Sequence, residues 1–237
     1  MKFVIHKANT RGHANHGWLN AKHSFSFASW YNPERIHFGA LRVLNDDVVA
    51  PGMGFGKHPH DNMEIITIPL RGALRHEDSM GFSEVINAGE VQVMSAGTGI
   101  YHSEFNASNS EDINLFQIWI FPNKQQVEPR YDQITYELSD LENNFHQLVS
   151  PNPEDEGTWI HQNAWIHMAS LTKDKSLEYN LKDSKNGVYF MVIDGEFEIE
   201  ANTLSERDAI GIWETESIKL KAINKGKILA IEVPMIF

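Results

Sequence analysis

Short apolar stretches alternate with polar turns along the whole chain. Runs rich in Val, Ile, Phe and Trp are separated by Gly, Asn and Asp, a pattern typical of β-strands. Short helices are expected only at Pro33–Ile36 and at Ser139–His146, where Ser139 and Glu142 have the spacing of a capping box. The expected strands are Gly39–Leu44, Glu64–Leu70, Glu84–Ile86, Val91–Met94, Asn114–Phe121, Val188–Ile193, Ala209–Trp213, Ser217–Ala222 and Ile228–Val233.

A weak internal repeat divides the chain. The segment Pro69-Leu-Arg-Gly72 precedes a predicted hairpin in the first half, and Val192-Ile-Asp-Gly195 does the same about 120 residues later. Many short strands with such a repeat favour an all-β protein with two antiparallel β-barrel domains. We expect these domains at residues 1–135 and 145–237, joined through the polar stretch Asn123–Asn144.

Composition and charge narrow the function classes. The 237 residues include 32 Asp and Glu against 20 Lys and Arg, a net charge of −12. This acidity disfavours nucleic-acid and anionic-membrane partners, because both are polyanions. The chain has no Cys, which excludes disulfides, thiolate metal sites and Cys nucleophiles. A metal would have to be held by imidazole and carboxylate groups, and the chain has 12 His.

The ends and the apolar runs favour a cytoplasmic location. Only three apolar residues precede His6 and Lys7, whereas a secretory signal needs an apolar run of about 7–15 residues. The longest apolar stretches, such as Tyr189–Ile193, have the length of a strand and fall far short of the roughly 20 residues of a membrane span.

Two pairs of ligand-type residues carry the strongest chemical signal. His58 and His60 are two positions apart, as are His102 and Glu104, so within a strand each pair points to one face. Glu64 has the same parity as His58 and His60 and is expected to face the same way. Two antiparallel strands with two inward ligands each can surround one divalent ion, and Pro59 favours an edge or bulge for the first of them.

Histidines in such positions also have a simpler interpretation. A single inward His is more often a packed polar side chain than a ligand, and two His pairs can be unrelated surface features. The matched spacing of four ligand-type residues favours a metal site of the kind that suits Fe, Zn, Cu, Ni or Mn. No direct role is expected for the remaining candidates, of which His76 is placed on a solvated hairpin arm: His13, His16, His23, His76, His161 and His167.

The sequence resembles the cupins, and within them the pirin family. The first cupin motif is matched by Gly52, His58, His60 and Glu64, with Gly72 one residue late. The second is matched by Gly89, Gly97, His102 and Asn106, with Ser95 in place of proline and two extra residues before His102. These departures are those of pirins, which the chain also resembles at Arg11–Trp18, Ser24–Phe27 and Leu41–Asp46.

The resemblance implies a bicupin of two antiparallel barrel or jelly-roll domains with the metal in the N-terminal one. The implied ligands are His58, His60, His102 and Glu104, and Glu64 is implied to lie behind them or in local packing. The implied ion is Fe(II), with Zn, Cu, Ni, Mn or Co as alternatives. The C-terminal cupin, which has no His pair near Leu181 and Asp183, is expected to be free of metal.

The chain is most similar to bacterial pirin-like proteins with quercetin 2,3-dioxygenase activity. This implies ring cleavage of a flavonol with O2 and release of CO, with Glu104 as both ligand and general base. Phe38, Phe55 and Phe116 are candidates for an apolar pocket wall. The alternatives are an iron-binding regulatory protein that acts through a protein partner, and a structural bicupin whose metal is incidental.

Overall fold

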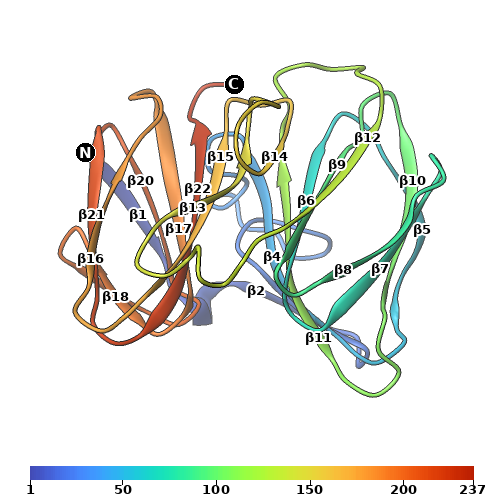
Figure 1. The fold of residues 1–237 in the computed structure, drawn as a ribbon, viewed down its shortest axis with the longest axis horizontal. Coiled ribbons are helices and arrows are strands. Elements are labelled where there is room, and N and C mark those ends of the chain that lie inside the picture. Colours follow the sequence, from blue (N-terminus) through green and yellow to red (C-terminus); the bar gives the residue numbers. More distant parts are fainter.

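The protein folds almost entirely into antiparallel strands, as expected from the sequence (Figure 1). The structure is a computed structural model that describes residues 1–237. The strands that form the N-terminal half are β2 (Gly12–Asn15), β3 (Leu19–His23), β4 (Leu41–Val49), β5 (Gly54–His60), β6 (Glu64–Arg71), β7 (Ala73–Asp78), β8 (Ser83–Asn87), β9 (Glu90–Ser95), β10 (Ile100–Asn106), β11 (Ile113–Ile120) and β12 (Arg130–Thr135).

The C-terminal half is built from the first strand of the chain and from all the strands that follow β12. Its strands are β1 (Lys2–His6), β13 (His146–Ser150), β14 (Thr158–Trp159), β15 (Trp165–Leu171), β16 (Ser176–Asn180), β17 (Asn186–Asp194), β18 (Glu196–Ile199), β19 (Asn202–Ser205), β20 (Ala209–Trp213), β21 (Ser217–Ala222) and β22 (Gly226–Pro234).

The strands form four layers, two in each half (Figure 1). The N-terminal sandwich pairs a seven-stranded sheet, ordered β12-β9-β6-β11-β4-β3-β2, with a four-stranded sheet, ordered β5-β10-β7-β8. The C-terminal sandwich repeats this with the orders β1-β20-β17-β22-β15-β13-β14 and β16-β21-β18-β19. The two seven-stranded sheets face each other in the middle, and the four-stranded sheets lie outside them.

The central strands bury both faces, which explains their nearly continuous apolar sequence. On β11, Phe116 and Ile118 face the other domain, whereas Gln117 and Trp119 face the interior of their own sandwich. Successive side chains of a strand point to opposite sides. One strand therefore supplies both the core between the domains and the wall of a cavity.

The largest core lies between the two domains. It contains 27 buried residues drawn from both seven-stranded sheets, among them Ile66, Tyr189 and Ile231. The interior of the C-terminal sandwich holds a single cluster of 16 apolar residues. The N-terminal interior holds two separate clusters of 7 and 4, because buried polar side chains occupy the space between its sheets. A polar interior of this kind is where ligand-type side chains can converge.

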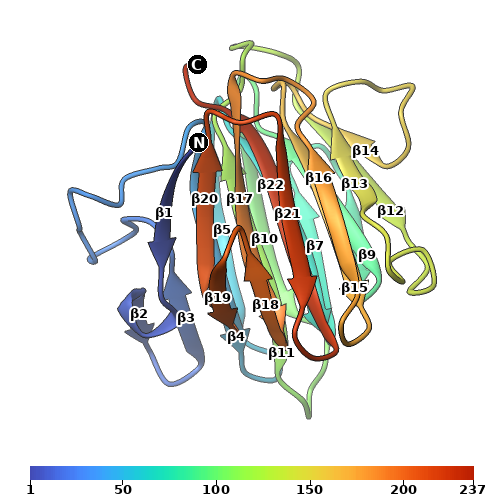
Figure 2. The ribbon, with the colours of Figure 1, turned by 90° about the vertical axis from the view of Figure 1, so that its left-hand side faces the viewer.

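The first strand of the chain belongs to the C-terminal sheet. β1 pairs antiparallel with β20, from Lys2 opposite Trp213 to His6 opposite Ala209, and lies at the edge beside β20 (Figure 2). The chain then crosses to the N-terminal sheet through the 3-10 turn η1 (Ala8–Thr10). The domain bounds 1–135 and 145–237 stay a prediction. Residues 2–6 fall within the first of these ranges but pair with a strand of the second.

Both predicted helices are turns in the structure. Pro33–Ile36 forms a turn, and Ser139–His146 is a series of turns that ends where β13 begins. In the second segment, Asn143 adopts a left-handed φ of 54°, and the carbonyl of Leu141 accepts from the backbone N–H of Ser170. Docking of this buried leucine against β15 thus overrides the local capping signal. No helix has the length and apolar character of a membrane span.

Contact between β5 and β10 depends on a glycine. A Cβ at Gly54 would collide with the backbone of Glu104 and Phe105, whereas a Cβ at Gly56 would meet nothing within 4 Å. Gly54→Ala is expected to destabilise the protein by about 1–3 kcal/mol, because it forces the two strands apart. The matched variant Gly56→Ala is expected to stay within about 0.5 kcal/mol of wild type. Urea unfolding measures both, and equal losses would contradict the close approach.

Candidate metal centre

Two neighbouring strands bring three histidines together inside the N-terminal sandwich. β5 and β10 pair antiparallel with His102 opposite His58. The Nε2 atoms of these two rings are 3.0 Å apart, and one ring nitrogen from each of His58, His60 and His102 lies within 4.8 Å of the others. β5 is an edge strand, which confirms the position expected from Pro59.

The spacing of these nitrogens fits ligands of one ion. Two nitrogens that each lie about 2.0–2.1 Å from a shared metal are roughly 2.9–3.4 Å apart at octahedral or tetrahedral angles. Nδ1 of His58 is 2.8 Å from the carbonyl oxygen of Gly56. Because a carbonyl only accepts, we assign the hydrogen to Nδ1, which leaves the Nε2 lone pair free to face His102.

Glu104 lies deeper in the same cavity. A β-bulge separates it from His102 in the pairing with β5, and its side chain is almost fully buried. Nε2 of Gln117 donates to both carboxylate oxygens at 3.2 Å, and Oγ1 of Thr67 donates at 3.4 Å. A carboxylate oxygen of Glu104 is within 4.8 Å of a ring nitrogen of His102. All four expected ligands therefore line one cavity.

The cavity is small and has mixed walls. Its volume is about 80 Å³. Phe55 lines it as expected, but Phe38 and Phe116 do not, because both point into the core between the domains. Sequence reasoning missed the wall residues that come from the central sheet and the N-terminal loop, since only the fold brings them there: Phe27, Asn45, Asp47, Ile65, Gln117 and Trp119.

Burial favours the uncharged form of His60 and His102. Burial, together with the charges of the neighbouring histidines, lowers the pKa of His60 to about 4 and that of His102 to about 3. Neutral rings keep a lone pair for a metal at neutral pH. Burial also raises the pKa of Asp47 to about 8, helped by the charges of Asp46 and Glu104. The group thus supplies nitrogen donors and carboxyl groups suited to a divalent transition ion.

Glu64 faces away from this cavity, contrary to expectation. A turn over residues 61–63, with Asn62 at a φ of 44°, separates β5 from β6 and breaks the parity count. On β6, Glu64 shares a face with Ile66 toward the other domain, and Ile65 lines the cavity. Its carboxylate accepts from Oγ of Ser95 at 2.7 Å. It is a buried packing carboxylate in this structure.

His76 is not on a solvated arm as expected, but fully buried on β7. The four-stranded sheet closes over the sandwich, so the inward face of this hairpin is interior. His23 is also buried, and its Nδ1 lies 2.9 Å from Oδ1 of Asn45 in the cavity wall. The other four histidines lie outside the cavity lining: His13, His16, His161 and His167.

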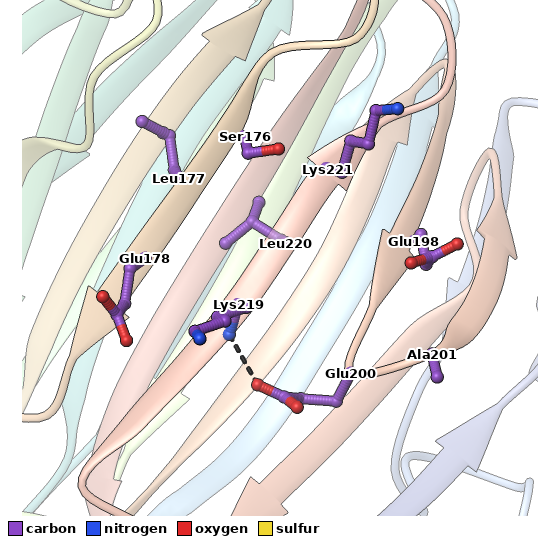
Figure 3. A pocket seen from close by; sticks show the side chains of 9 residues that line it. All are labelled: Ser176, Leu177, Glu178, Glu198, Glu200, Ala201, Lys219, Leu220 and Lys221. Carbon is purple, nitrogen blue, oxygen red and sulfur yellow. Dashed lines mark hydrogen bonds between the residues drawn. The ribbon is translucent and has the colours of Figure 1, made fainter.

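A wider depression lies on the outer sheet of the C-terminal half. It measures about 560 Å³ and is formed by β16, β18 and β21 (Figure 3). Its charged side chains alternate with inward apolar ones, as on any solvated sheet face. The backbone N–H of Lys219 donates to Glu200 at 2.6 Å. Glu178 and Glu198 lie apart from this contact in the close view, so the depression has no converging donor set.

Comparison with known families identifies the chain. A family model described as "Pirin" matches residues 4–120, and a model described as "Quercetinase C-terminal cupin domain" matches residues 147–233. The chain belongs to the pirin family. This confirms the family and the bicupin architecture expected from the sequence, and the first match spans the strands that carry all four expected ligands.

Several relatives align with nearly the whole length of this pirin. An Escherichia coli protein named quercetin 2,3-dioxygenase is 41% identical and aligns over 97% of this chain and 98% of its own length. A pirin-like protein of Caulobacter vibrioides is 38% identical over 93% and 95%. The crystal structure of E. coli YhhW in complex with nickel(II) has 40% identity and a TM-score of 0.93, with 98% and 99% of the two chains covered.

Glu64 predicts a pH dependence of stability. Burial raises its pKa from 4.5 to about 7, although Ser95, the backbone of His161 and Arg130 act against this shift. The folded state therefore binds a proton that the unfolded chain has released, and stability falls as pH rises through the window from 4.5 to 7. This titration is expected to lower the free energy of unfolding by an amount on the order of 2–3 kcal/mol, and Glu64→Gln should abolish that loss.

The check is urea unfolding of wild type and Glu64→Gln in the presence of a chelator, at several pH values from 5 to 8. The difference between the two free energies of unfolding should shift in favour of the variant as the pH rises. Other titrations are common to both proteins and cancel in this difference. Parallel pH profiles would show that Glu64 is charged throughout.

Proposed function

We propose that this pirin is a metal-dependent dioxygenase that opens the heterocyclic ring of a flavonol such as quercetin with O2 and releases CO. The observation that carries the proposal is the group of three clustered imidazoles, with His58 and His102 nitrogens 3.0 Å apart, beside the Glu104 carboxylate in one cavity. The names of the relatives support the same enzyme class, with the substrate left open.

The proposed ligands are His58, His60, His102 and Glu104. Fe(II) is the proposed ion, and nickel binding by a relative agrees with a site that accepts several divalent metals. When bound, the ion supplies Lewis acidity that lowers the pKa of a coordinated substrate hydroxyl. An imidazole that binds a metal through its lone pair adds no negative charge, so the positive charge of an ion would remain available to the substrate oxygens.

Glu104 is the proposed general base. Gln117 and Thr67 hold its carboxylate in place, which orients one oxygen toward the hydroxyl hydrogen of a substrate next to the histidines. Proton transfer to this oxygen gives the electron-rich flavonolate that reacts with O2. Burial of Glu104 keeps bulk water from competing for the same proton.

The cavity walls restrict how a flavonol enters. A volume of about 80 Å³ is well below the roughly 300–1,000 Å³ of sites that enclose drug-sized ligands. Only the reacting edge, with its hydroxyl and carbonyl, fits inside, and the remaining rings lie at the mouth. Asp47 and Trp119 line the cavity, and each has a buried polar atom without a hydrogen-bond partner, Oδ1 of Asp47 and Nε1 of Trp119.

The test is turnover by the iron-loaded protein. Quercetin is mixed anaerobically with the protein, and O2 is then admitted. Loss of flavonol absorbance with release of CO is expected only with the metal and O2. Turnover of other flavonols or small enols in place of quercetin would revise the substrate. Metal binding without turnover of any of them would overturn the enzymatic proposal in favour of the regulatory alternative.

Two variants separate binding from chemistry. His58→Ala is expected to lose the metal and all activity, because it removes one of the three clustered imidazoles. Glu104→Gln is expected to lower kcat by about 100- to 10,000-fold, since the amide cannot take the proton. His13→Ala, a surface histidine paired with Asn20, is the control and should match wild type. Metal analysis and CO release measure the outcome, and full activity in Glu104→Gln would exclude it as the base.

A further inference from the structure

A third strand adds another inward pair next to the proposed ligands. On β7, His76 lies opposite Glu104 and Asp78 lies opposite His102 in the antiparallel pairing with β10. Both side chains have no exposed surface. His76 and Asp78 are two positions apart, so they share the inward face of the strand. The same sheet thus presents a ligand-type pair on each of three adjacent strands.

Asp78 is firmly held and fixes the tautomer of His76. Its Oδ1 accepts the backbone N–H groups of Met80 at 2.9 Å and Phe82 at 3.2 Å. Its Oδ2 lies 3.1 Å from Nε2 of His76. The carboxylate oxygen accepts in this contact, so we assign the ring hydrogen of His76 to Nε2. Nδ1 of His76 is then an acceptor.

Two buried nitrogens beside the cavity have no partner. They are Nδ1 of His76 and Nδ1 of His102, on rings whose centroids are 5.3 Å apart. Buried polar atoms almost always find a hydrogen-bond partner. If the Nε2 lone pair of His102 faces an ion, its Nδ1 carries a hydrogen and must donate. Nδ1 of His76 is the acceptor that this hydrogen lacks.

We propose that His76 and Asp78 form a positioning pair for the metal ligand His102. In the proposed metal-bound arrangement, the Nδ1 hydrogen of His102 would turn to Nδ1 of His76, and the Nε2 hydrogen of His76 donates to Asp78 as it does in this structure. This chain of contacts fixes the His102 tautomer and aims Nε2 at the ion, as the Gly56 carbonyl does for His58. This role rests on the proposed metal site, but not on the reaction carried out there.

The first experiment measures Ni(II) affinity by competition with a chelator. His76→Leu removes the acceptor and is expected to weaken binding by about 10- to 100-fold, the usual effect of losing a partner of a metal-bound His. His76→Gln keeps an acceptor for His102 and a donor for Asp78, and is expected to stay within about threefold of wild type.

Asp78→Asn tests the direction of the chain. Its amide can present a donor to His76, which moves the hydrogen of His76 to Nδ1, where it opposes the hydrogen of His102. We expect a loss of affinity similar to that of His76→Leu. The control is His6→Leu, which removes a buried histidine that contacts Tyr189 at 2.8 Å in the other domain. It should leave the affinity unchanged, whatever its effect on stability.

The second readout is the tautomer of His102 in the Zn(II)-loaded protein, from long-range ¹H–¹⁵N NMR spectra of the imidazoles. Wild type and His76→Gln should show a single form with hydrogen on Nδ1 and metal on Nε2. His76→Leu should show line broadening or a mixture of tautomers at His102. A role of His76 in packing alone would change the thermal stability of the metal-free protein without changing this signature.

The outcomes separate the two proposals. Failure of the wild type to bind any metal would overturn both the metal site and the pairing. Metal binding with the same affinity and the same His102 signature in all variants would overturn the pairing alone. A nitrogen of His76 also lies within 4.8 Å of ligand atoms of His102 and Glu104. Two ions per wild-type chain and one in His76→Leu would therefore make His76 a metal ligand, and this result would also overturn the positioning role.

Discussion

The register between β5 and β10 is the constraint on which the site depends. It places His102 opposite His58, and the alternation of side chains then brings His60 and Glu104 to the same interior. A slip of one residue would turn an entire pair of ligand-type side chains to the solvent. The close approach of the two backbones at Gly54 and the large sheet behind them make that slip costly.

The sequence revealed the parts of the site that are local to one strand. His58 and His60, like His102 and Glu104, share a face because they are two residues apart, and no knowledge of the fold is needed. Counting every second residue gave the wrong face for Glu64, because a turn between β5 and β6 interrupts the alternation of side chains. The same counting could not place His76, because the buried face of a hairpin is known only once the sheet that packs against it is known.

The polar cavity is compatible with a stable fold because the largest core lies elsewhere. The neighbours Asp46 and Asp47 illustrate the division. Asp47 lines the cavity, whereas Asp46 points toward the domain interface, where its carboxylate accepts from Arg11 at 3.2 Å and Arg207 at 2.9 Å. The sequence predicted the two domains but not this shared core, which arises from contacts between residues more than 100 positions apart, such as Phe38 and Tyr189.

The position of β1 has a consequence for how the molecule assembles. β1 precedes the N-terminal sandwich in the chain but completes the sheet of the C-terminal sandwich, so that sheet is whole only when both parts of the chain are together. Its edge at β20 stays open until the N-terminal segment docks, and the backbone thereby links the two sandwiches at both ends of the chain. Swinging one sandwich away from the other would require breaking the row of hydrogen bonds between β1 and β20, and this ties the half that contains the histidine cluster to a rigid support.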